Sequence, residues 1–292
     1  MKNNSNPSLD GLDSLNYQPL SNEKLYHYCP TKSFWAILES RTLWLSSIHS
    51  LNDFSEWDWG KKLVTKVLND DVIEFRADFR FIVQKLFDET TKNLHPLIFS
   101  LSRNNDLLSQ WRAYADNGEG FAFEFDAERM CNVFPANFKE ISYTKNEQLL
   151  LVKNSLEFFA SWWRQDEDTK KQESVIKILP WFILDLLSLK HHSFIEEDEV
   201  RMIHILTKIE NNWVDFGGHT PSNSKIPGVQ INERIAFNKL APYIAYPFEY
   251  KSLITGVVLG PKNKNTIEEV KIKLSEMGIS DIKVSKSDSP YR

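Results

Sequence analysis

Cysteine is scarce in this sequence. The chain has 292 residues but only two cysteines, Cys29 and Cys131, and they do not form a CxxC pair. Secreted disulfide scaffolds and zinc clusters both need several cysteines at short spacings. We therefore expect neither a disulfide framework nor a zinc cluster, and this cysteine content fits a reducing compartment.

Long hydrophobic runs are also missing. The most apolar stretch, residues 175–189, is interrupted by Lys177, Pro180 and Asp185, whereas a transmembrane helix needs about 20 consecutive apolar residues. The first residues are rich in Asn and Ser and contain no apolar run of the kind that a signal peptide requires. We interpret residues 175–189 as a buried helix, and we expect a cytoplasmic protein without a membrane partner.

The sequence has no excess of positive charge and lacks the common catalytic signatures. Its 35 basic and 40 acidic residues give a net charge of -5, so the chain as a whole is not attracted to nucleic acid or to an anionic membrane. It contains no P-loop, GxGxxG, HExxH or GxSxG motif. The doublet His191–His192 has no third ligand at a useful spacing, so we expect no metal.

Strand and helix patterns alternate along most of the chain. Residues 1–22 are polar and aperiodic, which predicts a flexible N-terminal extension. No linker divides residues 23–292, so we expect one α+β domain there. A polar stretch at residues 211–228 predicts a surface loop, which could serve as a lid or recognise a target. Strands are predicted at residues 25–28, 42–46, 97–102, 121–125, 200–206, 253–259 and 282–284, and helical periodicity is found in residues 61–92, 106–114, 147–164, 173–189 and 267–277.

Two groups of candidate site residues lie near the start of the chain. His27 and Tyr28 end the opening strand, where a histidine ring could bind a ligand hydroxyl or be half-buried and bonded to backbone. Residues 46–56, which include Ser46 and Asn52, are largely polar and lie between two apolar elements. That segment is typical of either a structured turn or the polar lining of a cleft.

A third group joins a strand serine to a helix. Ser100 and Ser102 share one face of a predicted strand, and Trp111 and Tyr114 share one face of the following helix. An aromatic ring there could stack on a flat ligand. Filling the core is the favoured interpretation for Trp111, whereas the two interpretations are balanced for Tyr114.

The fourth group is an acidic run that leads into a strand. In extended conformation Glu197, Glu199 and Arg201 would point to one face. Two carboxylates at this spacing raise one pKa unless a cation such as Arg201 offsets their repulsion. The arrangement suits binding of ribose hydroxyls or stabilisation of a developing positive charge, and the alternative is a solvated loop before a strand.

Taken in order, these groups resemble a bacterial family catalogued as domain of unknown function 2971. The resemblance runs from about Leu25 to Gly260. It departs from the family at Phe54, where proline is usual, and at Val200, where an aromatic is usual. The segments that carry it are Leu25-Tyr26-His27-Tyr28, Leu51-Asn52-Asp53 with Glu56, Ser102, Trp111 with Tyr114-Ala115-Asp116, Gly120 with Glu124-Phe125-Asp126, and Glu197, Glu199 and Arg201.

The opening strand, its histidine and the short helix after it resemble, more distantly, the first motif of ADP-ribosyltransferases. This resemblance implies a split antiparallel sheet flanked by helices, with NAD as substrate and no metal. It also implies that His27 holds the NAD ribose hydroxyls, that Tyr114 or Trp111 stacks on nicotinamide, and that Glu199 or Glu197 stabilises the transition state. The bulky Tyr28 departs from the small residue usual after the histidine. The residues expected to line the NAD site are His27, Tyr28, Ser46, Asn52, Ser102, Trp111, Tyr114 and Arg201.

The function implied by this resemblance is cleavage of NAD and transfer of ADP-ribose to a macromolecule, either protein or nucleic acid. Such an enzyme would fit a toxin or an anti-phage defence system, in which a partner protein is also expected. Two other functions stay open. The same cleft could bind or process a nucleotide or nucleic acid without NAD chemistry, or the chain could be a non-enzymatic interaction protein whose polar groups are structural.

Overall fold

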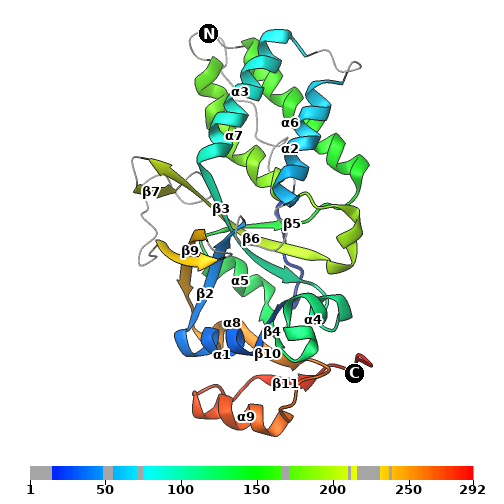
Figure 1. Cartoon of the computed structure of the whole chain (residues 1–292), viewed down its shortest axis with the longest axis vertical. Helices are drawn as coiled ribbons and strands as arrows, with labels where there is room; N and C mark the ends of the chain where they lie inside the picture. The colour runs from blue at the N-terminus through cyan, green and yellow to red at the C-terminus, as the bar shows by residue number, and fades with distance from the viewer. Residues whose placement is uncertain are drawn as a thin grey trace.

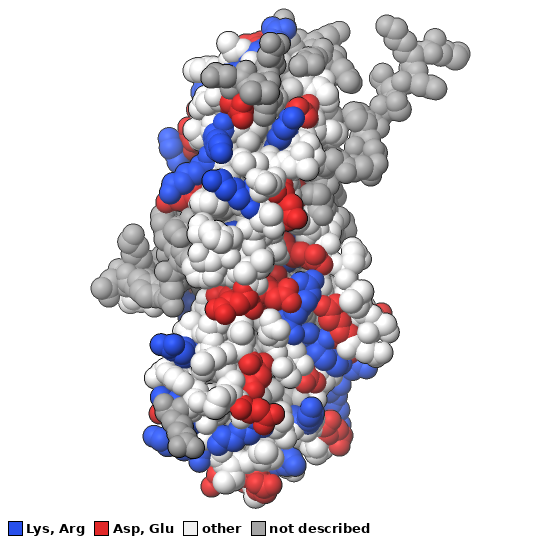
Figure 2. Space-filling view, turned by 90° about the vertical axis from the view of Figure 1, so that its right-hand side faces the viewer, with Lys and Arg blue, Asp and Glu red and all other residues white. Residues whose placement is uncertain are grey.

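The computed structural model describes residues 15–48, 55–70, 75–165, 171–209, 212–215, 231–236 and 239–291. The molecule is elongated, with a group of long helices at one end, a sheet across the middle, and shorter helices at the other end (Figure 1). Acidic and basic side chains are mixed over the side seen in Figure 2, with acidic ones gathered midway along the long axis. Both signs of charge therefore occur along that side of the molecule.

The described residues form an 11-stranded sheet that is antiparallel except where β10 pairs with β11. The predicted α+β class and mostly antiparallel sheet are therefore confirmed. The strands are β1 (Lys24–Cys29), β2 (Thr42–Ser47), β3 (Leu94–Ser102), β4 (Phe121–Asp126), β5 (Asn137–Glu140), β6 (Glu199–Ile209), β7 (Asn212–Asp215), β8 (Ile231–Ala236), β9 (Lys239–Pro247), β10 (Ile254–Leu259) and β11 (Lys283–Lys286).

The sheet forks at β3. One edge of β3 pairs with β6 along its whole length. The other edge is shared, because Leu97 and Ile98 pair with β2 whereas Ser102 pairs with β1. β1 and β2 therefore diverge from the same edge, and Ser100 lies between them with its side chain exposed.

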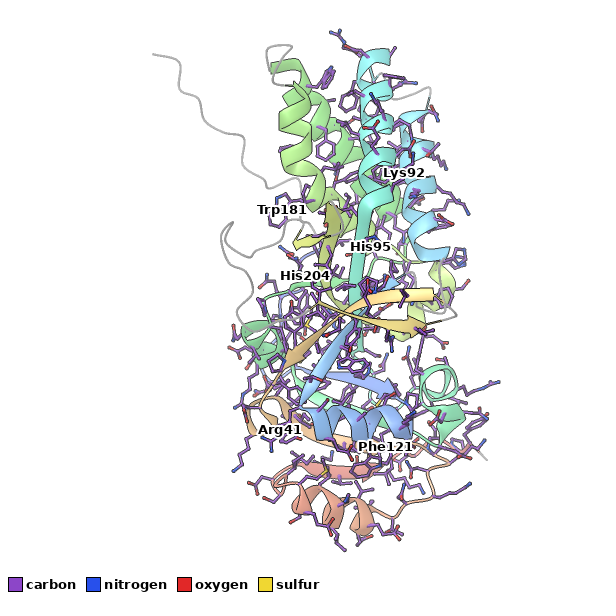
Figure 3. The ribbon with its side chains drawn as sticks, turned by 60° about the vertical axis from the view of Figure 1, so that its left-hand side comes forward. Arg41, Lys92, His95, Phe121, Trp181 and His204 are labelled. Atoms are coloured by element: carbon purple, nitrogen blue, oxygen red, sulfur yellow. The ribbon has the colours of Figure 1, made fainter. Side chains whose placement is uncertain are left out.

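One face of the sheet is covered by the group of long helices. These are α2 (Ser55–Leu68), α3 (Ala77–Asn93), α6 (Lys145–Gln165) and α7 (Lys171–Leu186). Their apolar stripes pack on Ile98, Ile203 and Ile205 of the β3–β6 pair. The helices predicted at residues 147–164 and 173–189 correspond to α6 and α7. Figure 3 shows Lys92, near the end of α3, above His95 in β3, so α3 continues directly into the central strand.

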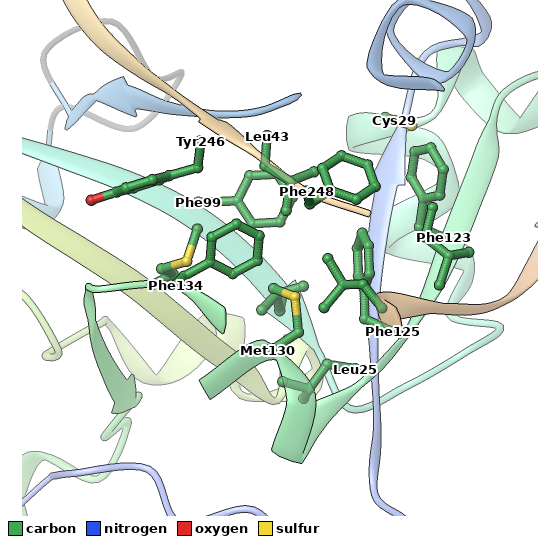
Figure 4. Close-up of a cluster of buried hydrophobic side chains, with 14 of the residues drawn as sticks. Leu25, Cys29, Leu43, Phe99, Phe123, Phe125, Met130, Phe134, Tyr246 and Phe248 are labelled. Carbon is green, nitrogen blue, oxygen red and sulfur yellow. The ribbon is translucent and has the colours of Figure 1, made fainter. Parts of the chain in front are cut away.

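The other face carries a second core, rich in aromatic side chains, under the short helices. These are α1 (Thr31–Ser40), α5 (Ala127–Val133), α8 (Tyr250–Leu253) and α9 (Ile267–Glu276), while α4 (Leu108–Tyr114) and the 3-10 helices η2 (Asp116–Gly118) and η3 (His192–Glu197) border the sheet elsewhere. Figure 4 shows the rings of Phe99 from β3 and of Phe123 and Phe125 from β4 in one cluster with Met130 and Phe134. Alternation along each strand places these rings on one face.

The N-terminal extension differs from the prediction. Residues 1–14 lie outside the described residues, but residues 15–17 run along β5. The Tyr17 N–H donates to the Phe138 carbonyl at 2.9 Å, the Glu140 N–H donates to the Leu15 carbonyl at 2.9 Å, and Tyr17 is 4% exposed. The expectation of a loose segment over residues 1–22 is therefore wrong for this part. A polar, aperiodic segment can still pair through its backbone with a strand edge, where side-chain pattern has little influence.

Replacement of the buried Phe123 by alanine is expected to lower the free energy of unfolding by about 3–5 kcal/mol, because it opens a cavity between stacked rings. Phe123 is 0% exposed and its ring centroid lies 4.8 Å from that of Phe34. Phe81 on α3 is 71% exposed and provides the control, since its replacement by alanine should cost less than about 0.5 kcal/mol. Urea unfolding of both variants checks this, and equal losses would contradict the packing described above.

Candidate functional site

The acidic run is bent rather than extended. Glu197 ends η3, Asp198 adopts a left-handed conformation with φ 42°, and β6 begins only at Glu199. Of the two interpretations of this run, the extended one is therefore not found at Glu197. The chain turns before the strand, as the other one holds, but Glu197 is buried rather than solvated. Consecutive acidic residues are poor strand formers, and aspartate tolerates the left-handed region better than most residues. The bend nevertheless keeps the side chains of Glu197 and Glu199 close together.

Both glutamates bind one lysine, and an arginine holds Glu199 from the other side. Lys190 Nζ donates to Glu197 Oε2 at 2.6 Å and to Glu199 Oε2 at 3.1 Å. Arg201 Nε and Nη2 donate to the two oxygens of Glu199 at 2.7 and 2.9 Å. Arg201 Nη1 also donates to the carbonyl of Leu187 at 2.7 Å. We call Lys190, Glu197, Glu199 and Arg201 the charged cluster; each of them is between 2% and 8% exposed.

The cluster keeps Glu199 ionised. Burial alone would raise the pKa of Glu199, because it disfavours the charged carboxylate. Attraction by Arg201 and Lys190 outweighs burial, and together with hydrogen bonds from Arg201 and Ser100 it lowers the pKa of Glu199 to about 2. Glu199 is therefore a fixed anion at neutral pH whose charge is largely balanced by two cations.

Two exposed side chains contact the cluster. Tyr114 is 38% exposed, and its hydroxyl donates to Glu197 Oε1 at 3.4 Å. Ser100, exposed at the fork, hydrogen-bonds Glu199. The two carboxylates are thus buried but directly linked to side chains that solvent or a ligand can reach. Of the two predicted aromatic residues, Tyr114 is the one that contacts a predicted acidic residue, Glu197.

A second buried ion pair adjoins the cluster. Lys139 Nζ donates to Asp185 Oδ1 at 2.9 Å, and both side chains are 0% exposed. Lys139 pairs with Arg201 across β5 and β6, so the two side chains lie on the same sheet face. The face therefore holds three buried cations and three buried anions, and this balance offsets the cost of burying them.

Sequence reasoning missed Lys139, Asp185 and Lys190 as members of this group. Asp185 interrupts the apolar stretch at residues 175–189, and Lys190 follows it directly. A charged residue within or next to a buried apolar run needs an opposite charge nearby. That signal was present in the sequence, but it does not indicate which residue is the partner.

His27 lies on the opposite face of the sheet from the glutamates. Tyr26 pairs with Ser102, and Ser102 pairs with Glu199, so these three side chains share one face. His27, the next residue along β1, points to the other face and stacks on Phe99 with 4.1 Å between ring centroids. The expected convergence of His27 with Glu199 is therefore not found, because neighbouring residues in a strand point in opposite directions.

At the fork, the His27 side chain forms a hydrogen bond with the backbone of β3. Its Nδ1–H donates to the Ser100 carbonyl at 2.9 Å, beyond the point where β1 pairs with β3. Burial lowers the pKa of His27 to about 4, although this bond acts in the opposite direction. His27 is thus a neutral, half-buried histidine bonded to backbone, which was one of the two interpretations of the sequence.

The remaining predicted site residues have other contacts. Trp111 is 0% exposed and its Nε1 donates to Asp106 at 2.6 Å, so it fills the core. Tyr28 packs edge-on against Trp111, with its hydroxyl bonded to backbone at Asn104 and Leu107. The hydroxyl of Ser102 donates to the Glu197 carbonyl at 2.7 Å and holds η3 against the sheet. Ser46 accepts a hydrogen bond from Arg234 on the same sheet face, and Asn52 lies outside the described residues.

The described part of the chain gives no sign of a metal centre or of a membrane span. No group of three or more His, Cys, Asp or Glu in it could hold a metal ion. None of its helices combines the length and apolar character needed to cross a bilayer. The loop prediction for residues 211–228 is wrong at residues 212–215, which form β7 and pair with β6. The rest of that stretch lies outside the described residues, so neither of its two expected roles is tested.

Comparison with known proteins gives one match. A family model described as protein of unknown function (DUF2971) matches residues 110–202, the segment that runs from α4 into β6 and contains Tyr114 and the charged cluster. The resemblance to that family is therefore supported over this segment. No curated protein and no solved structure matches the chain, so the resemblance to ADP-ribosyltransferases has no support from these comparisons.

Replacement of Lys190 by methionine should lower the free energy of unfolding by about 3–5 kcal/mol, because it removes a cation that two buried carboxylates share. Adding Glu197→Gln to this variant should restore part of the loss. The control is Lys153→Met, since Lys153 is 42% exposed in its pair with Glu157 and should contribute less than about 1 kcal/mol. Chemical unfolding gives all three values, and a mild effect of Lys190→Met would contradict the cluster.

Stability should fall as the pH drops from 6.5 toward 4, because the unfolded chain protonates His27 more readily than the folded one. The contribution of His27 is complete above its unfolded pKa and lost through this window, amounting to at most about 3 kcal/mol. His27→Asn keeps an N–H donor but does not titrate, and should flatten this part of the profile. Unfolding measured at several pH values tests this, and an unchanged profile would contradict the depressed pKa of His27.

Proposed function

We propose that the chain is an enzyme that cleaves NAD and transfers ADP-ribose to a macromolecule, with Glu197 as the catalytic residue. The observation that carries the proposal is a pair of carboxylates fixed on one sheet face and linked to the exposed Tyr114. A rigid anion next to an accessible aromatic ring suits a substrate that combines a flat base with a sugar on which positive charge develops.

The charge distribution favours Glu197 over Glu199 for contact with the substrate. Glu199 is held by three hydrogen bonds from two cations, so most of its negative charge is balanced. Glu197 binds Lys190 through Oε2, and its Oε1 faces the hydroxyl of Tyr114 at 3.4 Å. We therefore assign Glu199 to positioning Lys190 and Arg201, and Glu197 to binding the ribose.

The proposed reaction requires little of the protein beyond this carboxylate. The bond between ribose C1′ and the nicotinamide nitrogen breaks, and its electron pair leaves with nicotinamide. The positive charge left on the ribose is stabilised by Glu197 until an oxygen or nitrogen of the acceptor attacks C1′ and loses its proton to solvent. Tyr114 is assigned to stacking on nicotinamide. His27 has no role in this scheme, because it lies on the other sheet face.

The neutrality of the buried charges supports a second candidate, a nucleotide-binding or interaction protein without NAD chemistry. Three cations balance three anions on this face, and such balance lowers the field available to stabilise a positive transition state. On this alternative the cluster serves to hold η3, α7 and β6 together.

Incubation with isotope-labelled NAD, with and without cell lysate, tests the first candidate. We expect nicotinamide release, and expect Glu197→Gln to slow it about 100-fold or more, by analogy with the loss of one transition-state-stabilising group. Glu196→Gln is the matched control, because Glu196 is the exposed neighbour in η3. His27→Asn should keep the activity.

The outcomes separate the two candidates. Release that Glu197→Gln abolishes and Glu196→Gln preserves would support transfer chemistry, and the labelled fraction would identify the acceptor as protein, DNA or RNA. Absence of both NAD binding and nicotinamide release under all conditions would rule it out and leave the binding role. Release lost on His27→Asn, in a variant that stays folded, would contradict the assignment of the site to the Glu197 face.

A further inference from the structure

An exposed aromatic–arginine group on the β2 side of the fork takes no part in the function proposed above. Trp44 is 41% exposed, and its ring stacks on that of Tyr243 with 4.4 Å between centroids and 30° between planes. The guanidinium carbon of Arg234 lies 5.8 Å from the centre of the Trp44 ring. β2, β8 and β9 pair so that all three side chains stand on one sheet face. We call these three residues the platform.

Arg234 has an incomplete set of partners. Its Nη2 donates to Ser46 Oγ at 3.0 Å, whereas its Nε is buried and has no hydrogen-bond partner. In the part of the chain that the structure describes, no carboxylate pairs with it. Arg103, by contrast, binds three carboxylates, those of Glu23, Glu140 and Asp198. A buried donor without an acceptor is rare in folded proteins, and a guanidinium without a carboxylate is suited to an anionic ligand.

We propose that the platform binds a nucleotide, with the base stacked on Trp44 and a phosphate bonded to Arg234. Aromatic side chains stack on the flat faces of nucleobases, and the planar guanidinium matches a phosphate group. The combination of a stacked indole and a half-buried cation selects ligands that carry both a flat ring and negative charge. Neither an apolar metabolite nor inorganic phosphate alone would use both parts of the platform.

A single nucleotide fits better than a strand of nucleic acid. Grooves for single strands need several cations along the backbone and several stacking rings, whereas the platform offers one guanidinium and one pair of rings. The net charge of the chain is -5, so the chain as a whole does not attract a polyanion.

The platform and the charged cluster share one face of the sheet. Ser46, which holds Arg234, pairs with Ile98, and Ile98 is two residues from the exposed Ser100 that bonds Glu199. A nucleotide on the platform would therefore lie on the same face of the sheet as Glu197. Binding there needs no chemistry at the cluster, so the proposal stands whether or not the chain cleaves NAD.

Titration calorimetry of the full chain with AMP and with adenosine tests the platform. We expect AMP to bind, and expect Trp44→Leu to weaken both AMP and adenosine by about tenfold or more, through loss of stacking. Arg234→Gln should weaken AMP by about tenfold or more and leave adenosine unchanged, because only the phosphate needs the charge. Arg41→Gln is the matched control, since Arg41 lies over the ring of Tyr250 at 4.9 Å elsewhere on the surface.

Thermal melting of each variant shows that it is folded before binding is compared. If Trp44→Leu melts early, Trp44→Phe replaces it. Because phenylalanine keeps a ring that can stack on the base, Trp44→Phe should lose less AMP affinity than the roughly tenfold expected for Trp44→Leu. No AMP binding by the wild-type chain would overturn the proposal, as would equal AMP binding by folded Trp44 and Arg234 variants. Binding of single-stranded RNA without binding of AMP would overturn it in favour of a nucleic-acid surface. Nicotinamide release is measured separately, so the two proposals can fail independently.

Discussion

The sharing of Lys190 between two buried glutamates is the interaction on which much of this structure depends. An isolated buried charge costs several kcal/mol, so neither Glu197 nor Glu199 could occupy its place without a cation within bonding distance. Lys190 follows α7, Glu197 ends η3 and Glu199 begins β6. The same contacts that neutralise the charges therefore join three elements, and Arg201 adds a bond to the backbone at the end of α7.

The fork at β3 determines the exposure and the hydrogen-bond partners of the side chains near the cluster. Where β1 and β2 separate, backbone groups of β3 lose their usual partners, and His27 binds one of them through its ring. The same separation exposes Ser100 within an otherwise buried strand. At the fork, a neutral histidine thus packs in the aromatic core on one face of the sheet, and the ionised Glu199 lies on the other face.

The sequence predicted the positions of helices and strands better than it predicted which side chains of different elements contact one another. Helical periodicity located α6 and α7 because their apolar stripes face a core, and the core interpretation of Trp111 is confirmed by its complete burial. The predicted convergence of His27 with Glu199 was wrong because it depends on the sheet face to which each side chain points. That face is set by the pairing register of the strands, which a single sequence does not show. The partners Lys139, Asp185 and Lys190 were missed for the same reason, since charge balance is a property of the assembled sheet.

The pairing of β3 with β6 has a consequence for how the chain folds. Ser102 pairs with Glu199 and Leu94 with Thr207, so the central ladder joins segments separated by α4, α5, α6 and α7. During synthesis β3 leaves the ribosome before β6 does, so the edge of β3 that binds β6 stays unpaired until β6 has been made. Proteins dominated by such distant contacts fold slowly and expose strand edges while they do so. A chaperone, or early packing of α3 on its neighbouring helices, would protect the unpaired edge of β3.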